Sequence, residues 1–148
     1  MISAIIAAGG KGTRMKAGKN KVFMEIGGRT ILERTVSAFE ENENIDEIII
    51  VTAEKELCRK MCLKNDFKKV SKICGGGKER RDSVYNGIKA ADGDIAVIHD
   101  GARCLISQEE IDAVIADCKK FGAAALGVKV KDSLKKADEN GFISSTLD

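Results

Sequence analysis

The hydrophobic residues of this chain gather in short continuous runs, and the stretches between the runs repeat their apolar positions at helical spacing. Continuous apolar runs predict parallel strands covered on both faces, because such strands need no polar alternation. The runs that predict strands are residues 3–7, 47–52, 69–73, 94–99 and 123–130. The segments that predict helices are residues 31–39, 54–63, 80–90 and 108–120. This alternation predicts an α/β fold with a parallel sheet and right-handed crossovers.

Two helix starts carry a capping pattern. Thr30 is followed three residues later by Glu33, and Ser107 is followed in the same way by Glu110. A hydroxyl at the first position and a carboxylate three residues on can satisfy the free amide groups at a helix start. The short apolar run 22–26 ends at two adjacent glycines, where we expect the chain to turn.

Composition narrows the class of protein. The chain has 148 residues, of which 43% are hydrophobic, and its formal net charge is +2. These values fit one globular domain, whereas they do not fit a nucleic-acid binder that relies on a strong basic field. No apolar run approaches the ~20 residues that cross a bilayer, and the first run is too short for a signal peptide. We therefore expect a protein that binds neither nucleic acid nor a membrane.

The cysteines indicate a reducing compartment. There are five of them, an odd number, and none forms a CxxC pair. Cys58 and Cys62 share a helix face, but the chain has a single histidine to complete a metal site. Reduced thiols therefore fit better than zinc ligands or disulfides, and we expect a cytoplasmic protein.

The loop after the first predicted strand carries the clearest chemical signal. It reads Gly9-Gly10-Lys11-Gly12 and is followed by Arg14 and Lys21. Glycine lets the backbone approach a ligand closely, and successive free N–H groups form a nest for phosphate oxygens. The loop is neither a P-loop nor a GxGxxG dinucleotide fingerprint. Taken alone it also fits a tight turn, but the clustered positive charge favours a nucleoside triphosphate site.

A second glycine loop joins a predicted strand to a predicted helix. Residues 75–77 are all glycine, and Lys78 and Ser83 follow them. Three consecutive glycines cost backbone entropy, which a close approach to a ligand would offset. The alternative is a tight turn, with Ser83 as a surface or capping hydroxyl.

A third polar group follows the predicted strand 94–99. Asp100 and Arg103 stand at its carboxyl end, where the ligands of open α/β sheets bind. The carboxylate could hold Mg²⁺ together with substrate phosphates, and the guanidinium could bind a phosphate. A surface ion pair between the two residues is the alternative. His99, the only histidine, lies on the apolar run, and we interpret it as a structural residue.

Together the three stretches resemble a known family. Residues 7–15 with Asn20-Lys21 resemble the signature of nucleotidyltransferases that act on sugar phosphates, and residues 76–84 and 99–103 narrow the resemblance to cytidylyltransferases. The most similar family is 2-C-methyl-D-erythritol 4-phosphate cytidylyltransferase, of the non-mevalonate isoprenoid pathway. The resemblance covers all 148 residues. It implies an enzyme with a Rossmann-like, three-layer, mostly parallel α/β domain, a protruding β-arm and a homodimeric assembly.

The resemblance also implies roles for individual residues. Arg14 and Lys21 would be catalytic, because they would stabilise charge on the α-phosphate of CTP in the transition state. Asp100 would hold the cofactor Mg²⁺, and Arg103 and Ser133 would contact the polyol phosphate. The positions implied to contact the nucleotide are Ala7, Ala8, Gly9, Gly10, Gly77, Lys78, Ser83 and Gly101.

The last stretch of the chain predicts a β-hairpin. Residues 132–137 and 141–147 are strand-like and flank Asn140-Gly141, a strong turn signal. By the resemblance, residues 132–148 belong to the β-arm, which in the family continues into an arginine and, further on, a lysine that positions the second substrate. We therefore expect the single domain 1–148 to be incomplete at its C-terminus. We also expect this chain to bind CTP yet to turn it over poorly.

Other functions fit the same motifs. A ribitol-5-phosphate cytidylyltransferase has similar motifs, and a non-catalytic module or fragment could bind CTP without reaction. A redox enzyme of the Rossmann type is the least favoured, because the dinucleotide fingerprint and its acidic partner are missing. The preferred prediction is transfer of CMP from CTP to 2-C-methyl-D-erythritol 4-phosphate, with release of pyrophosphate, in isoprenoid precursor biosynthesis.

Overall fold

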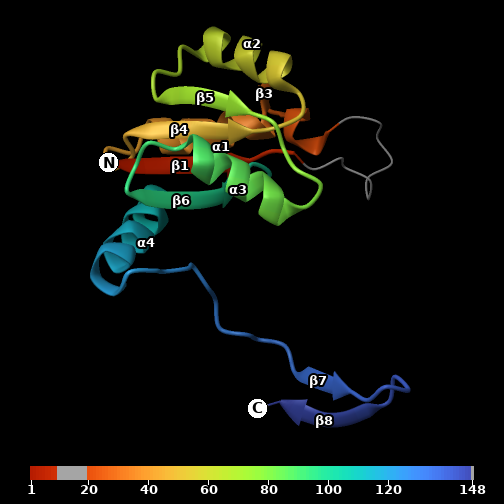
Figure 1. The fold of residues 1–148 in the computed structure, drawn as a ribbon. Helices are drawn as coiled ribbons and strands as arrows, with labels where there is room; N and C mark the ends of the chain where they lie inside the picture. Colours follow the sequence, from red (N-terminus) through yellow and green to blue (C-terminus); the bar gives the residue numbers. More distant parts are fainter. Residues whose placement is uncertain (10–19, 148) are drawn as a thin grey trace.

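A parallel sheet lies at the centre of the computed structural model, which describes residues 1–9 and 20–147 (Figure 1). Its four strands have the order β5-β4-β1-β6. The strands are β1 (Ile2–Ala7), β4 (Glu47–Val51), β5 (Val70–Cys74) and β6 (Ile95–Asp100). The helices are α1 (Ile31–Glu40), α2 (Lys55–Asn65), α3 (Arg80–Ala90) and α4 (Gln108–Phe121). The predicted alternation of parallel strands and helices is confirmed.

Strand β1 forms the middle of the sheet. Ile5 of β1 lies opposite Ile49 of β4 and Ile98 of β6, and both pairings are parallel. The branched residues of β4 are fully buried, as their continuous apolar run predicts. Each fully buried isoleucine contributes about 1.5–3 kcal/mol relative to an exposed one. Because all four strands run the same way, their carboxyl ends meet at one edge of the sheet, on the right of Figure 1.

Helices cover both faces of the sheet and give the predicted three layers. The larger core, between the sheet and helices α1, α2 and α4, contains Ile6, Phe39, Ile50, Cys58 and Ile111. The smaller core, under α3, contains Ile5, Ile49 and Val51. Neighbouring residues of one strand therefore enter different cores, which is why the strands carry no polar alternation.

The short run at 22–26 contains two elements and ends at the expected turn. Its first part is a 3₁₀ helix, η2 (Lys21–Phe23), and its last two residues form β2 (Glu25–Ile26). Strand β2 pairs antiparallel with β3 (Arg29–Thr30). The two glycines between them have φ values of 58° and 76°, in the left-handed region that glycine adopts without strain.

The predicted helix starts are confirmed with one correction. Thr30 Oγ1 accepts the backbone N–H of Glu33 at 3.1 Å, and Ser107 and Glu110 form the complete reciprocal box. The carboxylate of Glu33 does not return to its cap. It pairs with Nε of Arg29 at 3.0 Å, because the preceding hairpin brings that guanidinium to the start of α1.

The stretch 123–130 does not form the predicted strand. Gly122 ends α4 with a φ of 86°, and the residues after it are all exposed. They form an extended connection that leads away from the sheet (Figure 1). A strand needs a hydrogen-bonded partner, and no strand among the described residues pairs with this stretch.

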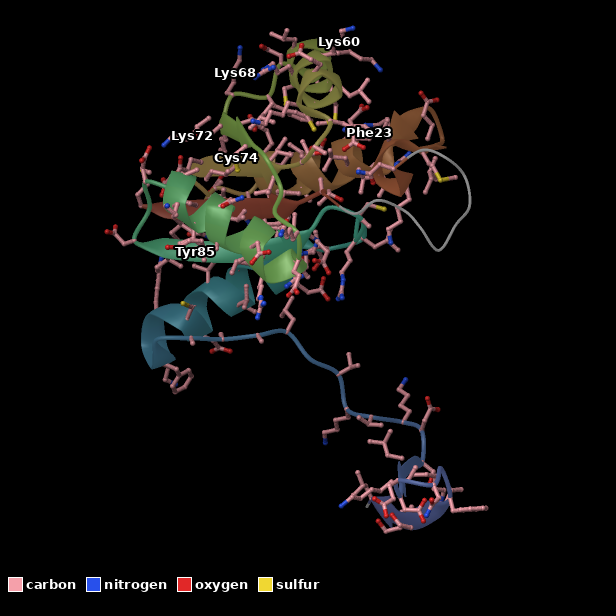
Figure 2. The ribbon with its side chains drawn as sticks, turned by 45° about the vertical axis from the view of Figure 1, so that its right-hand side comes forward. Phe23, Lys60, Lys68, Lys72, Cys74 and Tyr85 are labelled. Atoms are coloured by element: carbon pink, nitrogen blue, oxygen red, sulfur yellow. The ribbon has the colours of Figure 1, made fainter. Side chains whose placement is uncertain are left out.

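The predicted hairpin is confirmed. Strands β7 (Leu134–Ala137) and β8 (Ile143–Leu147) pair antiparallel, and Gly141 has a φ of 84° in the turn. Every residue of both strands is exposed. The hairpin stands apart from the α/β body in both views (Figures 1 and 2), as a protruding arm would. Among the described helices, none has the length and hydrophobicity of a membrane-spanning segment.

Candidate functional site

The residues that the sequence singled out converge at the carboxyl edge of the sheet. Gly9 follows β1, the loop 75–79 follows β5, and Asp100 ends β6. Lys21 begins η2, which is tied to the same edge. Parallel strands bring their carboxyl ends together whatever their separation in the sequence. The site is thus built from four segments that are remote in the chain.

The backbone at Gly9 lies close to the second glycine loop. A Cβ built on Gly9 would lie 3.9 Å from the Cα of Gly76 and 3.9 Å from Oγ of Ser83. Ala8, just before Gly9, extends the sheet by donating its N–H to the carbonyl oxygen of Val51 at 2.8 Å. The backbone that follows β1 and the loop that follows β5 therefore share one surface, as a single nucleotide site requires.

Ser83 shapes the second loop from inside. It is only 8% exposed, and its hydroxyl accepts the N–H of Gly77 at 3.0 Å and donates to the carbonyl of Glu79 at 3.2 Å. Gly77 has a steric need for glycine, since an added Cβ would lie 2.2 Å from the Cβ of Asp82. Lys78, at the tip of the loop, is exposed. The structure thus gives Ser83 a loop-shaping role, and its predicted contact with the nucleotide stays a prediction.

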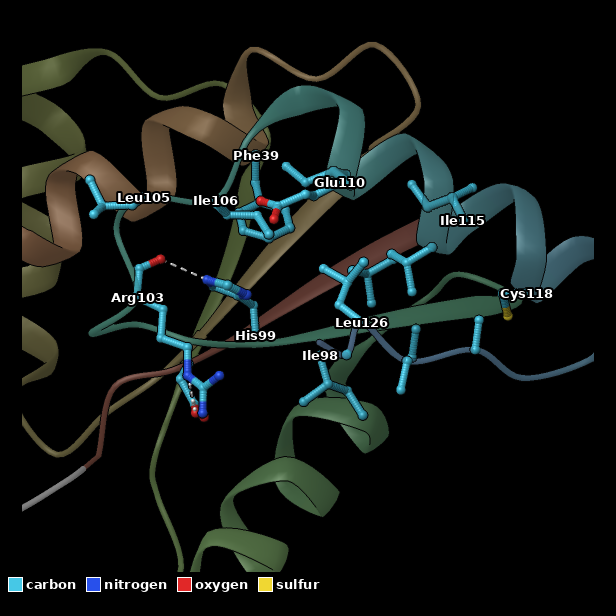
Figure 3. Close-up of a pocket in the computed structure, with 18 of the residues that line it drawn as sticks. Phe39, Ile98, His99, Arg103, Leu105, Ile106, Glu110, Ile115, Cys118 and Leu126 are labelled. Carbon is cyan, nitrogen blue, oxygen red and sulfur yellow. Dashed lines mark hydrogen bonds and ion pairs between the residues drawn. The ribbon is translucent and has the colours of Figure 1, made fainter. Parts of the chain in front are cut away.

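Asp100 lies between two arginines. Arg80 donates to its Oδ1 from Nε at 3.0 Å and from Nη2 at 2.8 Å, and Nε of Arg103 lies 3.1 Å from Oδ2 (Figure 3). Burial alone would raise the pKa of Asp100. The hydrogen bonds and charge of Arg80, together with the charge of Arg103, outweigh burial and lower that pKa. The carboxylate is therefore ionised near neutral pH, with both oxygens engaged.

Arg80 is a site residue for which the sequence predicted no role. The sequence does contain a signal for Arg80, because two consecutive arginines, Arg80 and Arg81, follow the second glycine loop. What the sequence could not show is that α3 begins beside the end of β6, which lies across β1 from β4 and β5. That placement lets the first residue of α3 reach the carboxylate at the end of β6.

Gly101 joins the end of β6 to the end of β1. Its N–H donates to the carbonyl of Ala7 at 2.8 Å, and its own carbonyl accepts the hydroxyl of Thr35 at 3.0 Å. A Cβ at this position would approach Leu32 and Ala8 at 3.1 and 3.2 Å. Two predicted nucleotide contacts, Ala7 and Gly101, are therefore bonded to each other.

His99 holds the turn that carries Arg103. Its Nε2 lies 2.9 Å from the carbonyl oxygen of Arg103, and its ring packs tilted against Phe39 at 5.1 Å (Figure 3). Because the carbonyl oxygen only accepts, Nε2 carries the hydrogen in this bond. The structural interpretation of His99 is confirmed, since its ring nitrogen serves the fold.

Lys21 is exposed and sits between two buried neighbours, Asn20 and Val22. Asn20 is a second residue to which the sequence gave no role, although it stands beside the predicted catalytic lysine. The other predicted catalytic residue, Arg14, and the predicted nucleotide contact Gly10 lie outside the described residues.

Ser133 is not brought to the site within this chain. It precedes β7 on the exposed connection that leads away from the sheet (Figure 1). Ser133 and its neighbours in the chain are exposed, so the α/β body does not hold them near the strand ends. Its predicted contact with a polyol phosphate stays a prediction.

The residues fit a divalent metal only in part. Among the described residues, no three His, Cys, Asp or Glu side chains are arranged to hold an ion. Mg²⁺ at nucleotide sites is bound by one or two carboxylates together with substrate phosphates, and Asp100 supplies one carboxylate. The site therefore fits a metal that arrives with the triphosphate, once Arg80 or Arg103 releases an oxygen of Asp100.

A pocket of about 850 Å³ extends from this turn along β6 and α4 (Figure 3). Arg80, Asp100 and Arg103 form its polar end. The rest is lined mostly by apolar residues of β6, α4 and the connection 124–128. A triphosphate needs cations and backbone amides, so only the polar end belongs to the candidate site.

Known proteins similar to this chain share one activity in their names. The model of the family 2-C-methyl-D-erythritol 4-phosphate cytidylyltransferase (IspD) matches residues 2–148. The protein of that name from Clostridium acetobutylicum is 45% identical over 152 residues, which cover 100% of this chain and 66% of that protein. The one from Caldanaerobacter subterraneus subsp. tengcongensis is 46% identical over 152 residues, which cover 99% of this chain and 67% of that protein.

A solved structure agrees with these relatives. The 4-diphosphocytidyl-2C-methyl-D-erythritol synthase of Anaerococcus prevotii DSM 20548 superposes with a TM-score of 0.84 at 30% identity. The superposition covers 100% of this chain and 63% of that one. The chain thus spans about two thirds of the length of the curated relatives that it matches.

Proposed function

Because the chain belongs to the 2-C-methyl-D-erythritol 4-phosphate cytidylyltransferase family, we propose that it transfers CMP from CTP to 2-C-methyl-D-erythritol 4-phosphate. The observation that carries this proposal is the closeness of Gly9 to Gly76 and Ser83, beside the turn that holds Asp100. Glycine backbone and cationic side chains gathered at the carboxyl ends of parallel strands suit a nucleoside triphosphate.

The nucleotide would lie across the two glycine loops. We propose that the backbone after β1 holds the phosphates and that the loop after β5 and the turn after β6 contact the cytidine. The phosphate-binding set is Ala7, Ala8, Gly9 and Gly10, and the cytidine-binding set is Gly77, Lys78, Ser83 and Gly101. The closeness of these segments supports the proposal, since one ligand can span all of them.

The proposed reaction needs alignment and charge stabilisation more than it needs a base. A 4-phosphate oxygen attacks the α-phosphorus of CTP, an O–P bond forms, and the bond to the bridging oxygen breaks so that pyrophosphate leaves with the electron pair. A phosphate monoester is already anionic near neutral pH. The protein therefore has to hold two anions in line and neutralise the growing charge. We assign this work to Arg14 and Lys21, with Arg103 on the side of the polyol phosphate.

Asp100 would hold Mg²⁺ together with the triphosphate. When bound, the metal would neutralise charge on the phosphate oxygens. The chain's own contribution is a carboxylate that stays ionised, because Arg80 and Arg103 lower its pKa.

The second substrate site would be completed by an assembly. Ser133 lies on the exposed approach to the hairpin, and the hairpin makes an arm that could reach another subunit. We propose a homodimer in which the arm of one chain brings Ser133 to the polyol phosphate. The five cysteines are free thiols, which fits the cytoplasmic location that we propose for the reaction.

Pyrophosphate release tests the proposed function. The chain is mixed with CTP, Mg²⁺ and either 2-C-methyl-D-erythritol 4-phosphate or ribitol 5-phosphate, and CTP binding is followed in parallel by calorimetry. We expect slow release with the methylerythritol phosphate, because the chain spans only about two thirds of its relatives, and still less release with the ribitol phosphate. The opposite preference would reassign the substrate, and CTP binding without release from either would make the chain a nucleotide-binding module.

A further inference from the structure

Asn20 is a buried amide whose hydrogen-bonding groups are all used. It is 8% exposed. Its Nδ2 donates to the carbonyl oxygen of Ala8 at 2.9 Å and to the carboxylate of Glu54 at 3.3 Å. Its Oδ1 accepts the backbone N–H of Val22 at 3.3 Å. An amide nitrogen has two hydrogens, so both donations occur at once.

These bonds tie η2 to the carboxyl ends of the two central strands. Ala8 extends β1 and is 1% exposed, and its own N–H is bonded to the last residue of β4. Glu54 follows β4 and also accepts the hydroxyl of Thr52 at 3.1 Å. Asn20 therefore ties the start of η2 to Ala8, 12 positions before it in the sequence, and to Glu54, 34 positions after it.

Lys21 gains a fixed backbone from this arrangement. Asn20 holds it on one side, and Val22, which is 3% exposed, packs into the core on the other. The carbonyl of Lys21 accepts the N–H of Met24 at 3.0 Å, which closes the turn of η2. Figure 2 marks this turn by Phe23, beside the carboxyl edge of the sheet. The side chain of Lys21 is left exposed above a rigid base.

We propose that Asn20 is the positioning residue that aims Lys21 at the α-phosphate, an inference that rests on the proposed function. A cation on a pre-ordered backbone stabilises a transition state at no further cost in ordering free energy during the reaction. A misplacement of such a group by 1 Å can lower the rate about 10²-fold. Asn20 touches no reacting atom in this scheme and acts only through Lys21.

An asparagine meets three requirements of this position together. The position needs two donors, for a carbonyl and a carboxylate, and one acceptor, for a backbone N–H. An aspartate would keep the acceptor but would turn a second carboxylate toward Glu54 and the carbonyl of Ala8. A serine would keep a capping oxygen, because it is a good N-cap, but its short side chain would not bridge both strand ends.

The test compares Asn20→Asp and Asn20→Ser with a matched control, Asn65→Ala. Asn65 makes a bond of the same kind, from Nδ2 to the carbonyl of Met61 at 2.9 Å, but it ends α2 at the opposite edge of the sheet. For each variant, kcat, KM for CTP and the melting temperature are measured. We expect kcat to fall about 10²-fold in both Asn20 variants, with a small change in KM, whereas Asn65→Ala loses only stability. Equal kcat values in all variants would overturn the proposal.

A second readout keeps the test separate from the proposed function. Acylation of the Lys21 amine is followed by mass spectrometry with and without CTP, and this needs no turnover. We expect CTP to protect Lys21 in the unchanged chain and much less in Asn20→Ser, which carries the test if Asn20→Asp does not fold. If the chain transfers no CMP, the proposed function fails, but this protection still decides the role of Asn20. Equal protection in both chains, or none in the unchanged chain, would refute that role.

Discussion

Lys21 and Gly77 have opposite proposed roles in the site. Lys21 would act through the charge at the end of its side chain, and Gly77 through its lack of a side chain. Lys21 is exposed on a turn whose neighbours are buried, so its charge can reach a ligand. Gly77 lies where any Cβ would collide with Asp82. Each property leads to a substitution with a defined result.

Replacing Lys21 by alanine should lower kcat strongly and change CTP affinity less, because the ammonium acts on charge that develops in the transition state. Removal of one preorganised donor typically costs about 10²–10³-fold in kcat. The matched control is Lys60→Ala, since Lys60 is exposed on α2, far from the strand ends (Figure 2). Pyrophosphate release at saturating CTP measures the effect, and an undiminished kcat in Lys21→Ala would remove Lys21 from the mechanism.

Replacing Gly77 by alanine should open the second loop, because the new Cβ would lie 2.2 Å from that of Asp82. Overpacking of this kind costs about 1–3 kcal/mol, so we expect CTP binding to weaken about tenfold or more. Gly75→Ala is the control, since the added Cβ would meet only the flexible end of Lys55 at 3.8 Å. Titration calorimetry with CTP decides the matter, and equal affinity in both variants would show that the loop does not contact the nucleotide.

At the scale of elements, one buried carboxylate joins the amino ends of the strands. Glu47, the first residue of β4, is 6% exposed. It accepts the hydroxyl of Ser3 in β1 at 2.5 Å, the hydroxyl of Ser71 in β5 at 2.9 Å and the backbone N–H of Asp92 at 2.6 Å. This network holds the amino ends of the strands together, at the edge of the sheet opposite the candidate site.

Because of this network, the free energy of unfolding depends on the protonation of Glu47 and therefore on pH. Burial alone would raise the pKa of Glu47, but the hydrogen bonds from Ser3, Asp92 and Ser71 outweigh it and lower the pKa from its ordinary value of 4.5. A lowered pKa stabilises the fold above the unfolded-state value, and this stabilisation is lost as the pH falls through the folded-state value. Glu47→Gln should therefore cost about 1.5–3 kcal/mol at pH 7, and the difference from the unchanged chain should shrink in acid.

Urea unfolding at neutral and acidic pH measures this difference, with Glu43→Gln as the exposed control. A Glu47→Gln variant whose deficit is the same at both pH values would contradict the account of the network.

Sequence patterns predicted the elements wherever their determinants were local. The branched run of β4 and the hydroxyl caps at Thr30 and Ser107 all appear in the structure as predicted. The strand predicted at 123–130 was wrong, because a strand depends on a hydrogen-bonded partner, which no local pattern reveals. For the run 22–26, the turn expected at its two glycines is present, but the elements inside the run could not be predicted, because a one-turn helix and a two-residue strand are too short to leave a periodicity.

The candidate site, too, could be predicted where its features depend on the order of elements along the chain and not where they depend on tertiary contacts. The position of the glycine loops and of Asp100 at strand ends could be predicted from order along the chain, since parallel strands gather their carboxyl ends. The partners of those residues could not. Arg80 reaches Asp100 and Asn20 reaches Ala8 only through the tertiary fold.

At the scale of the whole molecule, the chain consists of an α/β body and an exposed arm. All residues from 121 to 147 are exposed. Deletion of residues 132–148 should therefore leave the melting temperature of the body almost unchanged, because no buried contact is lost. Calorimetry measures this melting temperature, and loss of the cooperative transition would show that the arm supports the body.

Sedimentation of the full chain and of the chain without residues 132–148 tests the proposed dimer, which should be present in the full chain and absent after the deletion.

The claim on which the account depends is that the glycine loops at the carboxyl edge of the sheet hold the triphosphate of CTP. A crystal structure of the chain with CTP and Mg²⁺ is the most direct measurement. We expect phosphate density over Gly9 within reach of Lys21, with the cytidine along Gly77 and Lys78 and the metal beside Asp100. A nucleotide bound in the apolar pocket along β6 and α4, with both glycine loops free of ligand, would contradict it.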